Sequence, residues 1–251
     1  MQKKINVTVW NEDDGTLERN TQEAYPERIH NAIAAFLKGD ENIGTLRTAT
    51  MQQPENGLTQ EILDDTDVLI WWAHLYHGMV ADEVVERVRQ RVLSGMGLIA
   101  LHSAHAAKIL RVLLGTNTNK LRWRENNERE RVWIIEHNHP IVAGIGDYFE
   151  IPQSETYGEH YGIPAPDELL TISWFEGGEV FRSGCTWTRG CGKVFYFSPG
   201  HEGYRIYDMP VIQQIIKNGI KWAAPAGYPV ILPELHQPKS PEDIYKEKHG
   251  L

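Results

Sequence analysis

The hydrophobic positions of the first hundred residues alternate between short apolar runs and segments with helical spacing. Residues 67–72 and 97–101 are almost wholly apolar, which is typical of strands covered on both faces. Between them, valines recur at positions 80, 84, 85, 88 and 92 with charged residues among them, and this spacing predicts a helix. A strand is also predicted at 5–10 and a weaker one at 46–51, with a helix that has one apolar face around 29–37 and Pro26 in its first turn. This alternation predicts a parallel sheet with right-handed crossovers.

The second half of the chain has a different pattern. Residues 121–136 mix eight charges with apolar residues, which predicts one or two antiparallel strands at a sheet edge, and residues 154–166 read as a loop. Three further segments, 169–174, 179–187 and 193–197, are separated by turn residues and predict a β-meander. The fold class is therefore expected to be α/β, with a three-layer, mostly parallel central sheet and an antiparallel β extension.

The C-terminal part ends with one more helix and a polar segment. Isoleucines and Trp222 form the apolar face of a helix over 211–222, which Pro225 closes. The chain after that is interrupted by prolines and glycines. We expect one α/β domain over residues 1–225 and an extended C-terminal arm over 226–251.

Composition excludes several classes of protein. The 251 residues carry a net charge of −9, which argues against a nucleic-acid binder and against binding to an anionic membrane surface. No apolar run approaches the ~18–20 residues needed to cross a bilayer, and the first residues lack the apolar core of a signal peptide. Two cysteines, Cys185 and Cys191, are too few for a disulfide scaffold. A soluble, cytoplasmic protein is expected, and its arm and antiparallel segments are compatible with a homo-oligomer.

Histidines follow several of the predicted strands at the point where each strand ends. Ligands bind at the C-terminal ends of the strands in open parallel sheets, so these side chains are expected to meet in one crevice. Five of the eleven histidines have this placement, namely His74, His77, His102, His105 and His201.

Imidazoles gathered in this way suit Zn²⁺ or a similar divalent ion. His74, His102 and His201 are the first candidates for ligands, and His77 and His105, each three residues beyond a partner, are held in reserve. An ordinary solvated or hydrogen-bonded histidine is the alternative for each residue taken singly.

Carboxylates and aromatic residues near the same strand ends complete the candidate site. Glu155 and Glu159 are candidates for an acid/base group or an additional ligand, and Glu202 lies next to His201. The candidate catalytic residues are His102, Glu159, His201 and Glu202. The candidate substrate-binding residues are Asn11, Trp72, Glu155 and Tyr157, although packing in the core would by itself explain Trp72.

Several longer motifs resemble a known family. Val-Leu-Ile-Trp-Trp-Ala-His (68–74), Gly-Leu-Ile-Ala-Leu-His-Ser-Ala-His (97–105), Glu-Thr-Tyr-Gly-Glu (155–159) and Phe-Ser-Pro-Gly-His-Glu (197–202) are similar to segments of the trehalose-utilisation (ThuA-like) family. The resemblance extends over about residues 4–225. It implies a flavodoxin-like sheet related to the class I glutamine amidotransferases.

One difference from those amidotransferases affects the expected chemistry. Their nucleophilic cysteine sits in a Gly-x-Cys-x-Gly elbow, which corresponds here to residues 100–104, so that His102 takes the place of the cysteine. His201 and Glu202 resemble the segment that holds the base. Because a thiolate is the nucleophile of the amidotransferase reaction and neither cysteine lies near the elbow, glutaminase activity is not expected.

The resemblance implies a role in carbohydrate catabolism, with a disaccharide or keto-sugar derivative as the small-molecule substrate. Three hypotheses remain open. The first is a metal-dependent enzyme with a divalent ion, Zn²⁺ above all, among the histidines. The second is a metal-free hydrolase in which Ser103 acts with His201 and Glu202. The third is a non-catalytic sugar-binding or regulatory protein on an enzyme scaffold.

Overall fold

The protein is built around one mixed sheet. The structure, a computed structural model, describes residues 3–13, 19–118, 121–226 and 238–251. Within these residues a nine-stranded sheet has the order β2-β1-β3-β4-β9-β8-β7-β5-β6. Its parallel half consists of β1 (Ile5–Asn11), β2 (Ile43–Thr50), β3 (Val68–Trp72), β4 (Gly97–Leu101) and β9 (Gly192–Phe197).

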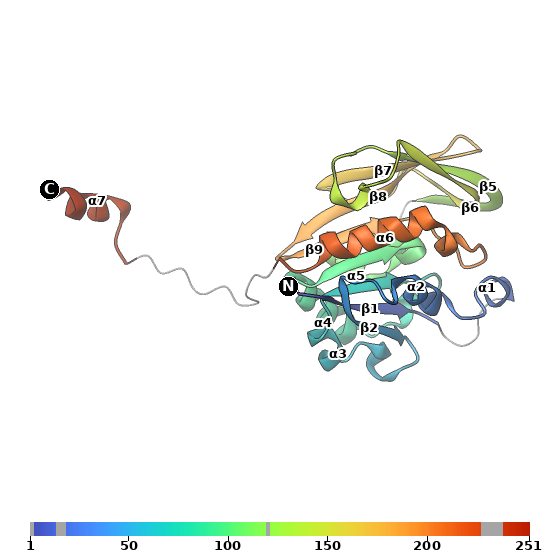
Figure 1. Ribbon diagram of the computed structural model, residues 1–251, viewed down its shortest axis with the longest axis horizontal. Helices are drawn as coiled ribbons and strands as arrows, with labels where there is room; N and C mark the ends of the chain where they lie inside the picture. The colour runs from blue at the N-terminus through green and yellow to red at the C-terminus, as the bar shows by residue number, and fades with distance from the viewer. Residues whose placement is uncertain (1–2, 14–18, 119–120, 227–237) are drawn as a thin grey trace.

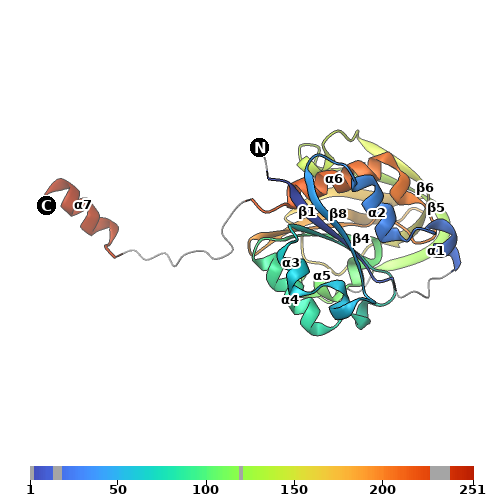
Figure 2. The ribbon, with the colours of Figure 1, turned by 60° about the horizontal axis from the view of Figure 1, so that its bottom comes forward.

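Helices cover both faces of the parallel half, which makes three layers (Figures 1 and 2). The helices of the described residues are α1 (Arg19–Ala24), α2 (Ile29–Leu37), α3 (Gln60–Asp64), α4 (Asp82–Leu93), α5 (Lys108–Leu114), α6 (Pro210–Ala223) and α7 (Pro241–His249). Alternation along the strands divides the core between the two faces. On β3, for example, Ile70 and Trp72 pack on the side of α2 and α6, whereas Leu69 and Trp71 pack on the side of α4 and α5.

The antiparallel half continues the same sheet beyond β9. It consists of β5 (Arg122–Ile134), β6 (Tyr148–Gly158), β7 (Glu168–Phe175) and β8 (Val180–Arg189). β9 pairs in parallel with β4 and antiparallel with β8, so it joins the two halves. The expected α/β fold with a parallel core and an antiparallel extension is confirmed.

Several local predictions were wrong. Residues 154–158, expected in a loop, form the end of β6, because their backbone pairs with β5 and their side chains are buried. Residues 121–136 contain the single antiparallel strand β5 (Arg122–Ile134), as one of the two expectations had it, but β5 lies between β6 and β7, so β6 is the edge strand. Helix α2 begins at Ile29, after a turn that contains Pro26.

The predicted arm lies partly outside the described residues, which resume at position 238. Its last part forms α7, a helix that the sequence pattern did not predict and that has no buried residue. Ser240 caps its first turn, since the Ser240 hydroxyl accepts a hydrogen bond from the Asp243 N–H.

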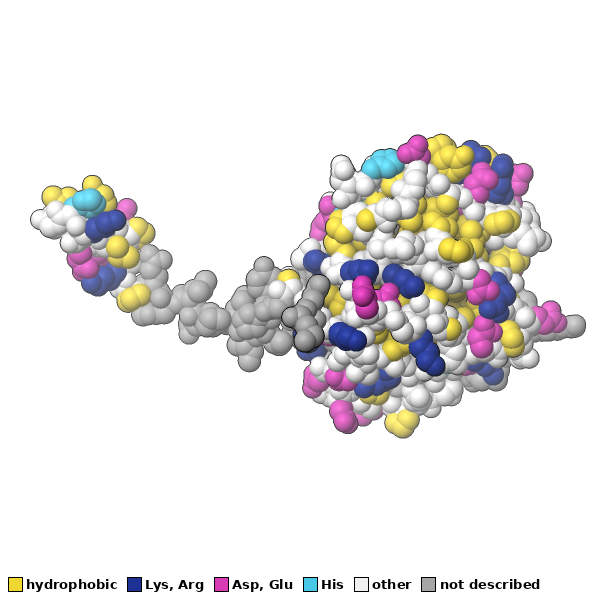
Figure 3. Space-filling model, in the orientation of Figure 1, with side chains coloured by type: hydrophobic (Ala, Val, Ile, Leu, Met, Phe, Trp, Pro, Cys, Tyr) yellow, Lys and Arg dark blue, Asp and Glu magenta, His cyan; other side chains and the backbone are white. Residues whose placement is uncertain are grey.

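None of the helices in the described ranges is long and apolar enough to span a bilayer. On the face drawn in Figure 3, Lys and Arg side chains lie next to Asp and Glu side chains instead of forming a patch of one sign.

Candidate active site

Three histidines meet at the C-terminal ends of the parallel strands, around one buried carboxylate. His74 follows β3, His102 follows β4, and His201 and Glu202 follow β9. The ring centroids of His74 and His102 are 6.3 Å apart, and those of His102 and His201 are 5.7 Å apart. With Glu155 from β6, these residues are called the His–Glu cluster below.

Glu202 lies between the three imidazoles. Its Oε1 atom is 3.6 Å from the Nε2 atom of His74 and 3.7 Å from the Nε2 atom of His201, and its Oε2 atom is 3.7 Å from the Nε2 atom of His102. Glu155 approaches His102 from the extension, with 3.4 Å between its Oε2 atom and Nε2. The cluster therefore draws on both halves of the sheet.

The local backbone explains how His102 reaches this position. His102 opens a short 3-10 helix, His102–Ala106, with a φ of +52°, a left-handed conformation that is uncommon for a residue with a side chain. This is the position that the sequence resemblance assigned to the amidotransferase elbow. Gly200 makes room for it, because a Cβ atom on Gly200 would lie 3.0 Å from the Cβ atom of His102.

The cluster contains polar atoms that are buried and unsatisfied. Among the described residues, four of its atoms have no hydrogen-bond partner: His102 Nε2, His201 Nε2, Glu155 Oε2 and Glu202 Oε2. An unsatisfied buried polar group costs roughly 1–3 kcal/mol, and more when it is charged. Four such atoms at one point are suited to bind a cation or a polar ligand.

The spacing of these atoms fits a small cation. Nitrogen and oxygen atoms 3.4–3.7 Å apart are too far apart for good hydrogen bonds. Ligand atoms each about 2.1 Å from a tetrahedral Zn²⁺ would be about 3.4 Å from one another. His74, His102 and Glu202 also place one ligand atom each within 4.8 Å of one another, as do Glu125, His201 and Glu202.

The hydrogen bonds of the Nδ1 atoms show which of these two sets of residues is better suited to bind a cation. His102 Nδ1 lies 3.2 Å from the carbonyl oxygen of Ser198, and His74 Nδ1 lies 3.2 Å from the hydroxyl of Ser103. Each Nδ1–H can donate to that oxygen, which leaves a lone pair on Nε2 for a metal ion.

His201 has the opposite arrangement. Its Nδ1 atom accepts a hydrogen bond of 2.8 Å from the backbone N–H of Gly203, so the neutral ring carries its proton on Nε2. An Nε2 atom that carries a proton cannot bind a metal ion. The geometry therefore favours His74, His102 and Glu202 as ligands and makes His201 a hydrogen-bond donor.

Burial and mutual charge shift the pKa values in opposite directions. Burial raises the pKa of Glu202, but His102, His74 and His201 outweigh this effect and lower it to about 2. Burial lowers the pKa of His102, but Glu202 and Glu155 raise it above its usual value. Burial raises the pKa of Glu155, and burial lowers the pKa of His201 to about 4. Glu202 is thus an anion near neutral pH, and His201 is neutral.

Tyr157 and Trp72, two of the expected substrate-binding residues, line the cluster. The Tyr157 ring stacks on His102 with centroids 5.6 Å apart, and its hydroxyl lies 2.9 Å from Ser103 Oγ. Trp72 lies with its ring centroid 6.3 Å from that of His102, although it also belongs to the buried core. Asn11 is buried at the end of β1, and its side chain accepts a hydrogen bond from the Asp13 N–H.

Glu159 is placed differently from the expected acid/base group. Its oxygens accept hydrogen bonds from the Arg182 guanidinium at 2.8 and 3.0 Å and from the Tyr161 N–H at 2.6 Å. Burial raises the pKa of Glu159, but these contacts outweigh it and lower the pKa. Because these contacts occupy its oxygens, Glu159 forms a structural ion pair with Arg182 and is not free to act as the acid/base group.

His77 and His105 lie beside the cluster, outside its centre. The His105 ring packs edge-on against Tyr157, with centroids 5.2 Å apart. Burial lowers the pKa of His77 to about 4 and that of His105 to about 3, and in each case a neighbouring histidine of the cluster adds to the effect. Both rings are neutral near pH 7.

Three residues of the site were missed by the sequence reading. Glu12 is buried after β1 and accepts hydrogen bonds from the backbone N–H groups of Leu75 and Tyr76, at 2.7 and 3.0 Å, so it holds the loop that carries His74. Glu125 Oε1 lies 3.5 Å from His201 Nε2, and the Tyr204 ring stacks on His201 with centroids 4.2 Å apart. The position of Glu12 at a strand end was a usable signal. Glu125 ends the segment Leu-Arg-Trp-Arg-Glu (121–125), which also resembles the ThuA-like family, but it lies where the register of β5 with β6 shifts.

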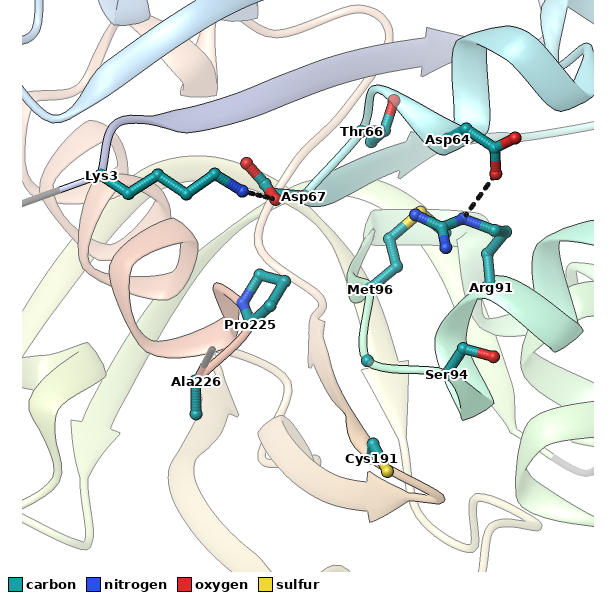
Figure 4. A pocket seen from close by; sticks show the side chains of 11 residues that line it. Lys3, Asp64, Thr66, Asp67, Arg91, Ser94, Met96, Cys191, Pro225 and Ala226 are labelled. Carbon is teal, nitrogen blue, oxygen red and sulfur yellow. Dashed lines mark hydrogen bonds and ion pairs between the residues drawn. The ribbon is translucent and has the colours of Figure 1, made fainter. Parts of the chain in front are cut away.

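A hollow at the opposite edge of the sheet has a different character. It encloses about 320 Å³ near the N-terminal ends of the strands, and Lys3, Asp64, Asp67, Arg91 and Cys191 are among its lining residues (Figure 4). Its charges are paired, since Lys3 lies 3.1 Å from Asp67 and Arg91 lies 3.6 Å from Asp64. The unsatisfied polar atoms of the His–Glu cluster make that cluster the better candidate site.

Comparison with known proteins agrees with the fold and the strand-end motifs. The sequence profile of the family described as "Trehalose utilisation" matches residues 6–223. The chain belongs to the ThuA family. A ThuA-like protein from Parabacteroides merdae has a similar structure, with a TM-score of 0.68 at 13% identity, over 94% of each chain. A ThuA-like protein from Bacteroides uniformis gives a TM-score of 0.62 at 15% identity, over 88% of this chain and 93% of that one.

Other similar structures show how widely the fold is used. A cytoplasmic protein of Salmonella typhimurium has a TM-score of 0.59 at 12% identity, over 88% of this chain and all of that one. The β-galactosidase of Rahnella sp. R3 matches 88% of this chain with 31% of its own, at a TM-score of 0.56 and 13% identity. No curated protein matches the sequence significantly. At these identities the structural likenesses establish the fold of this ThuA family member and not its reaction.

The cysteines of this ThuA protein lie away from the elbow. Cys185 is buried within β8, and Cys191 is exposed in the turn between β8 and β9; both are free thiols. Burial raises the pKa of Cys185 to about 12, so it is protonated at neutral pH. Neither thiol is therefore placed to act as a nucleophile at His102.

Proposed function

We propose that this ThuA protein is a metal-dependent enzyme of carbohydrate catabolism that acts on a sugar, with a divalent cation in the His–Glu cluster. The observation that carries the proposal is the convergence of buried, unsatisfied nitrogen and oxygen atoms at 3.4–3.7 Å spacing. His74, His102 and Glu202 would hold the ion, with Glu155 as a further ligand. The preference for Zn²⁺ follows from two imidazoles and carboxylates as donors.

The residues around this site have separable roles. When bound, a divalent cation would polarise a carbonyl or hydroxyl group of a sugar. His201 presents its Nε2–H beside Glu202 and can donate a hydrogen bond to a ligand oxygen. Burial raises the pKa of Glu155, which favours its protonated form more than in an exposed carboxyl group, so Glu155 is the candidate for proton transfer.

Metal analysis of the full-length protein, purified without a polyhistidine tag, tests the proposal. We expect about one zinc or other divalent ion per chain after dialysis, removal by a strong chelator, and recovery on addition of zinc. A protein that stays free of metal after exposure to zinc and to manganese would exclude a cation site.

A second candidate function is a metal-free hydrolase with Ser103 as nucleophile. The sequence assigned His201 as its base, but the structure favours His74, because Ser103 Oγ is 3.2 Å from His74 Nδ1 and His74 Nε2 is 3.6 Å from Glu202 Oε1. A serine, a histidine and a carboxylate in this order match the arrangement of a hydrolase triad. Labelling of Ser103 by a fluorophosphonate, unaffected by chelators, would favour this function over the first.

We infer a cytoplasmic location, as the sequence led us to expect, and the Salmonella neighbour described as a cytoplasmic protein supports it. A homo-oligomer and a non-catalytic role as a sugar-binding protein stay predictions. Turnover of a sugar by the metal-loaded protein would decide against the non-catalytic role.

A further inference from the structure

We propose that Trp123 forms an outer sugar-binding subsite, on which a second, uncharged sugar ring stacks when a disaccharide occupies the His–Glu cluster. The proposal rests on the proposed function and adds to it a residue that would determine specificity for the second sugar ring. It starts from an exposed tryptophan beside a buried polar site.

The strand register places Trp123 next to the cluster. Trp123 of β5 pairs directly with Tyr157 of β6, and residues opposite each other in an antiparallel pair have side chains on the same face, about 4.5–5.5 Å apart at Cβ. Tyr157 is 3% exposed and stacks on His102, whereas Trp123 is 66% exposed. The wall that Tyr157 begins inside the site therefore continues outward to Trp123.

Polar groups from the same stretch of β5 reach toward the cluster. Glu125 lies 3.5 Å from His201, and the side chain of Asn127 accepts a hydrogen bond from the Tyr204 hydroxyl. An aromatic face beside carboxylate and amide oxygens suits a pyranose ring, which presents C–H groups on its faces and hydroxyls around its rim.

The charges near Trp123 favour a neutral ligand. The Arg124 guanidinium is bound to the carboxylates of Glu128 and Glu179, and the Arg182 guanidinium is bound to Glu159. Glu125 adds a carboxylate beside the cluster, 3.5 Å from His201. The proposed cation would neutralise Glu155 and Glu202, but a phosphorylated or acidic outer ring would still meet Glu125, so an uncharged ring is the better fit.

Equilibrium binding to the full-length, zinc-loaded protein tests the subsite. Calorimetry would compare trehalose and maltose with glucose, for the wild type, Trp123→Ala and the control Trp133→Ala. Trp133 is a suitable control because it is also exposed on β5, at the other end of the strand. Circular dichroism and the zinc content of each variant show whether the fold and the cluster are intact.

We expect Trp123→Ala to weaken disaccharide binding roughly fivefold to tenfold and to leave glucose binding unchanged. Trp133→Ala should bind all three sugars like the wild type. The subsite is excluded if Trp123→Ala binds the disaccharides normally, if both variants lose the same affinity, or if neither disaccharide binds the zinc-loaded wild type. A change of oligomeric state in Trp123→Ala without a change of affinity would assign Trp123 to a subunit contact instead.

Failure of the proposed function gives a different result. If the wild-type protein binds no zinc, the metal-dependent enzyme is excluded, whatever the effect of Trp123→Ala on sugar binding. Zinc and disaccharide binding that do not depend on Trp123 exclude the subsite alone.

Discussion

The backbone N–H of Gly203 donates a 2.8 Å hydrogen bond to Nδ1 of His201. This contact fixes the proton of the neutral ring on Nε2, the nitrogen that points into the cluster. His102, whose ring centroid is 5.7 Å away, has its Nδ1 beside a carbonyl oxygen and so carries the opposite tautomer. His102 can therefore offer the lone pair of its Nε2 atom to a cation, whereas His201 can donate a hydrogen bond from its Nε2–H.

This difference predicts different effects of replacing the two rings. His102→Gln should lower zinc affinity at least tenfold, because it removes a ligand, whereas His201→Gln should keep about one zinc per chain. The measurement is competition for zinc with a chelating dye, followed by metal analysis. Loss of zinc in both variants to the same degree would contradict the assignment of His201 as a donor.

Glu12 is predicted to act on the site through the loop after β3. Glu12→Gln would place an amide N–H₂ where one of the N–H groups of Leu75 and Tyr76 needs an acceptor. We expect zinc affinity to fall about tenfold and the amides of Leu75 and Tyr76 to exchange faster with deuterium. The exposed Glu41→Gln serves as the matched control. Unchanged exchange in Glu12→Gln would show that the loop does not depend on this carboxylate.

Stability should fall on acidification because buried neutral histidines must become charged. Burial lowers the pKa of His77 to about 4 and that of His105 to about 3, whereas an unfolded histidine titrates near 6.5. The unfolded state therefore binds more protons between about pH 6.5 and pH 4, and the free energy of unfolding decreases as the pH is lowered through this window. Glu202, with a pKa of about 2, adds a loss of the same sign below about pH 4.5.

Urea unfolding at pH 7.5 and pH 5, with a chelator present, measures this effect. The wild type should lose on the order of 1–2 kcal/mol for each buried histidine between the two pH values. His105→Gln should lose less, and the control His137→Gln, at an exposed position, should lose as much as the wild type. Equal losses in all three proteins would rule out His105 as a source of the acid sensitivity.

The sequence predicted the part of the site that follows regular strands. The apolar runs that became β3, β4 and β9 located His74, His102 and His201, because parallel strands end at one edge of the sheet. Glu155 and Tyr157 were named as candidates although their segment was expected to be a loop. Their strand is stabilised by pairing with β5 and by burial. Neither effect can be predicted from the local strand propensity of the segment.

The roles of other site residues depend on contacts between distant parts of the chain, which the residue pattern of a single sequence does not reveal. Glu159 was expected to move protons, but Arg182, 23 positions later, pairs with it across the extension. Glu125 approaches His201 from a part of β5 where the register with β6 shifts. The roles of His201 and His102 differ through single backbone contacts of Gly203 and Ser198, so no pattern of residue types could have separated them.

β9 pairs in parallel with β4 on one side and antiparallel with β8 on the other, so it lies at the boundary between the two halves of the sheet. This boundary has a consequence for how substrate preference can change. His74, His102 and Glu202, which are proposed to hold the ion, follow β3, β4 and β9, whereas the aromatic residues Tyr157 and Trp123 come from β6 and β5. On the proposed function, the stacking of the sugar and the binding of the ion therefore depend mainly on separate stretches of the chain. Related proteins could exchange one sugar for another through substitutions in the outer strands while their imidazoles stay untouched.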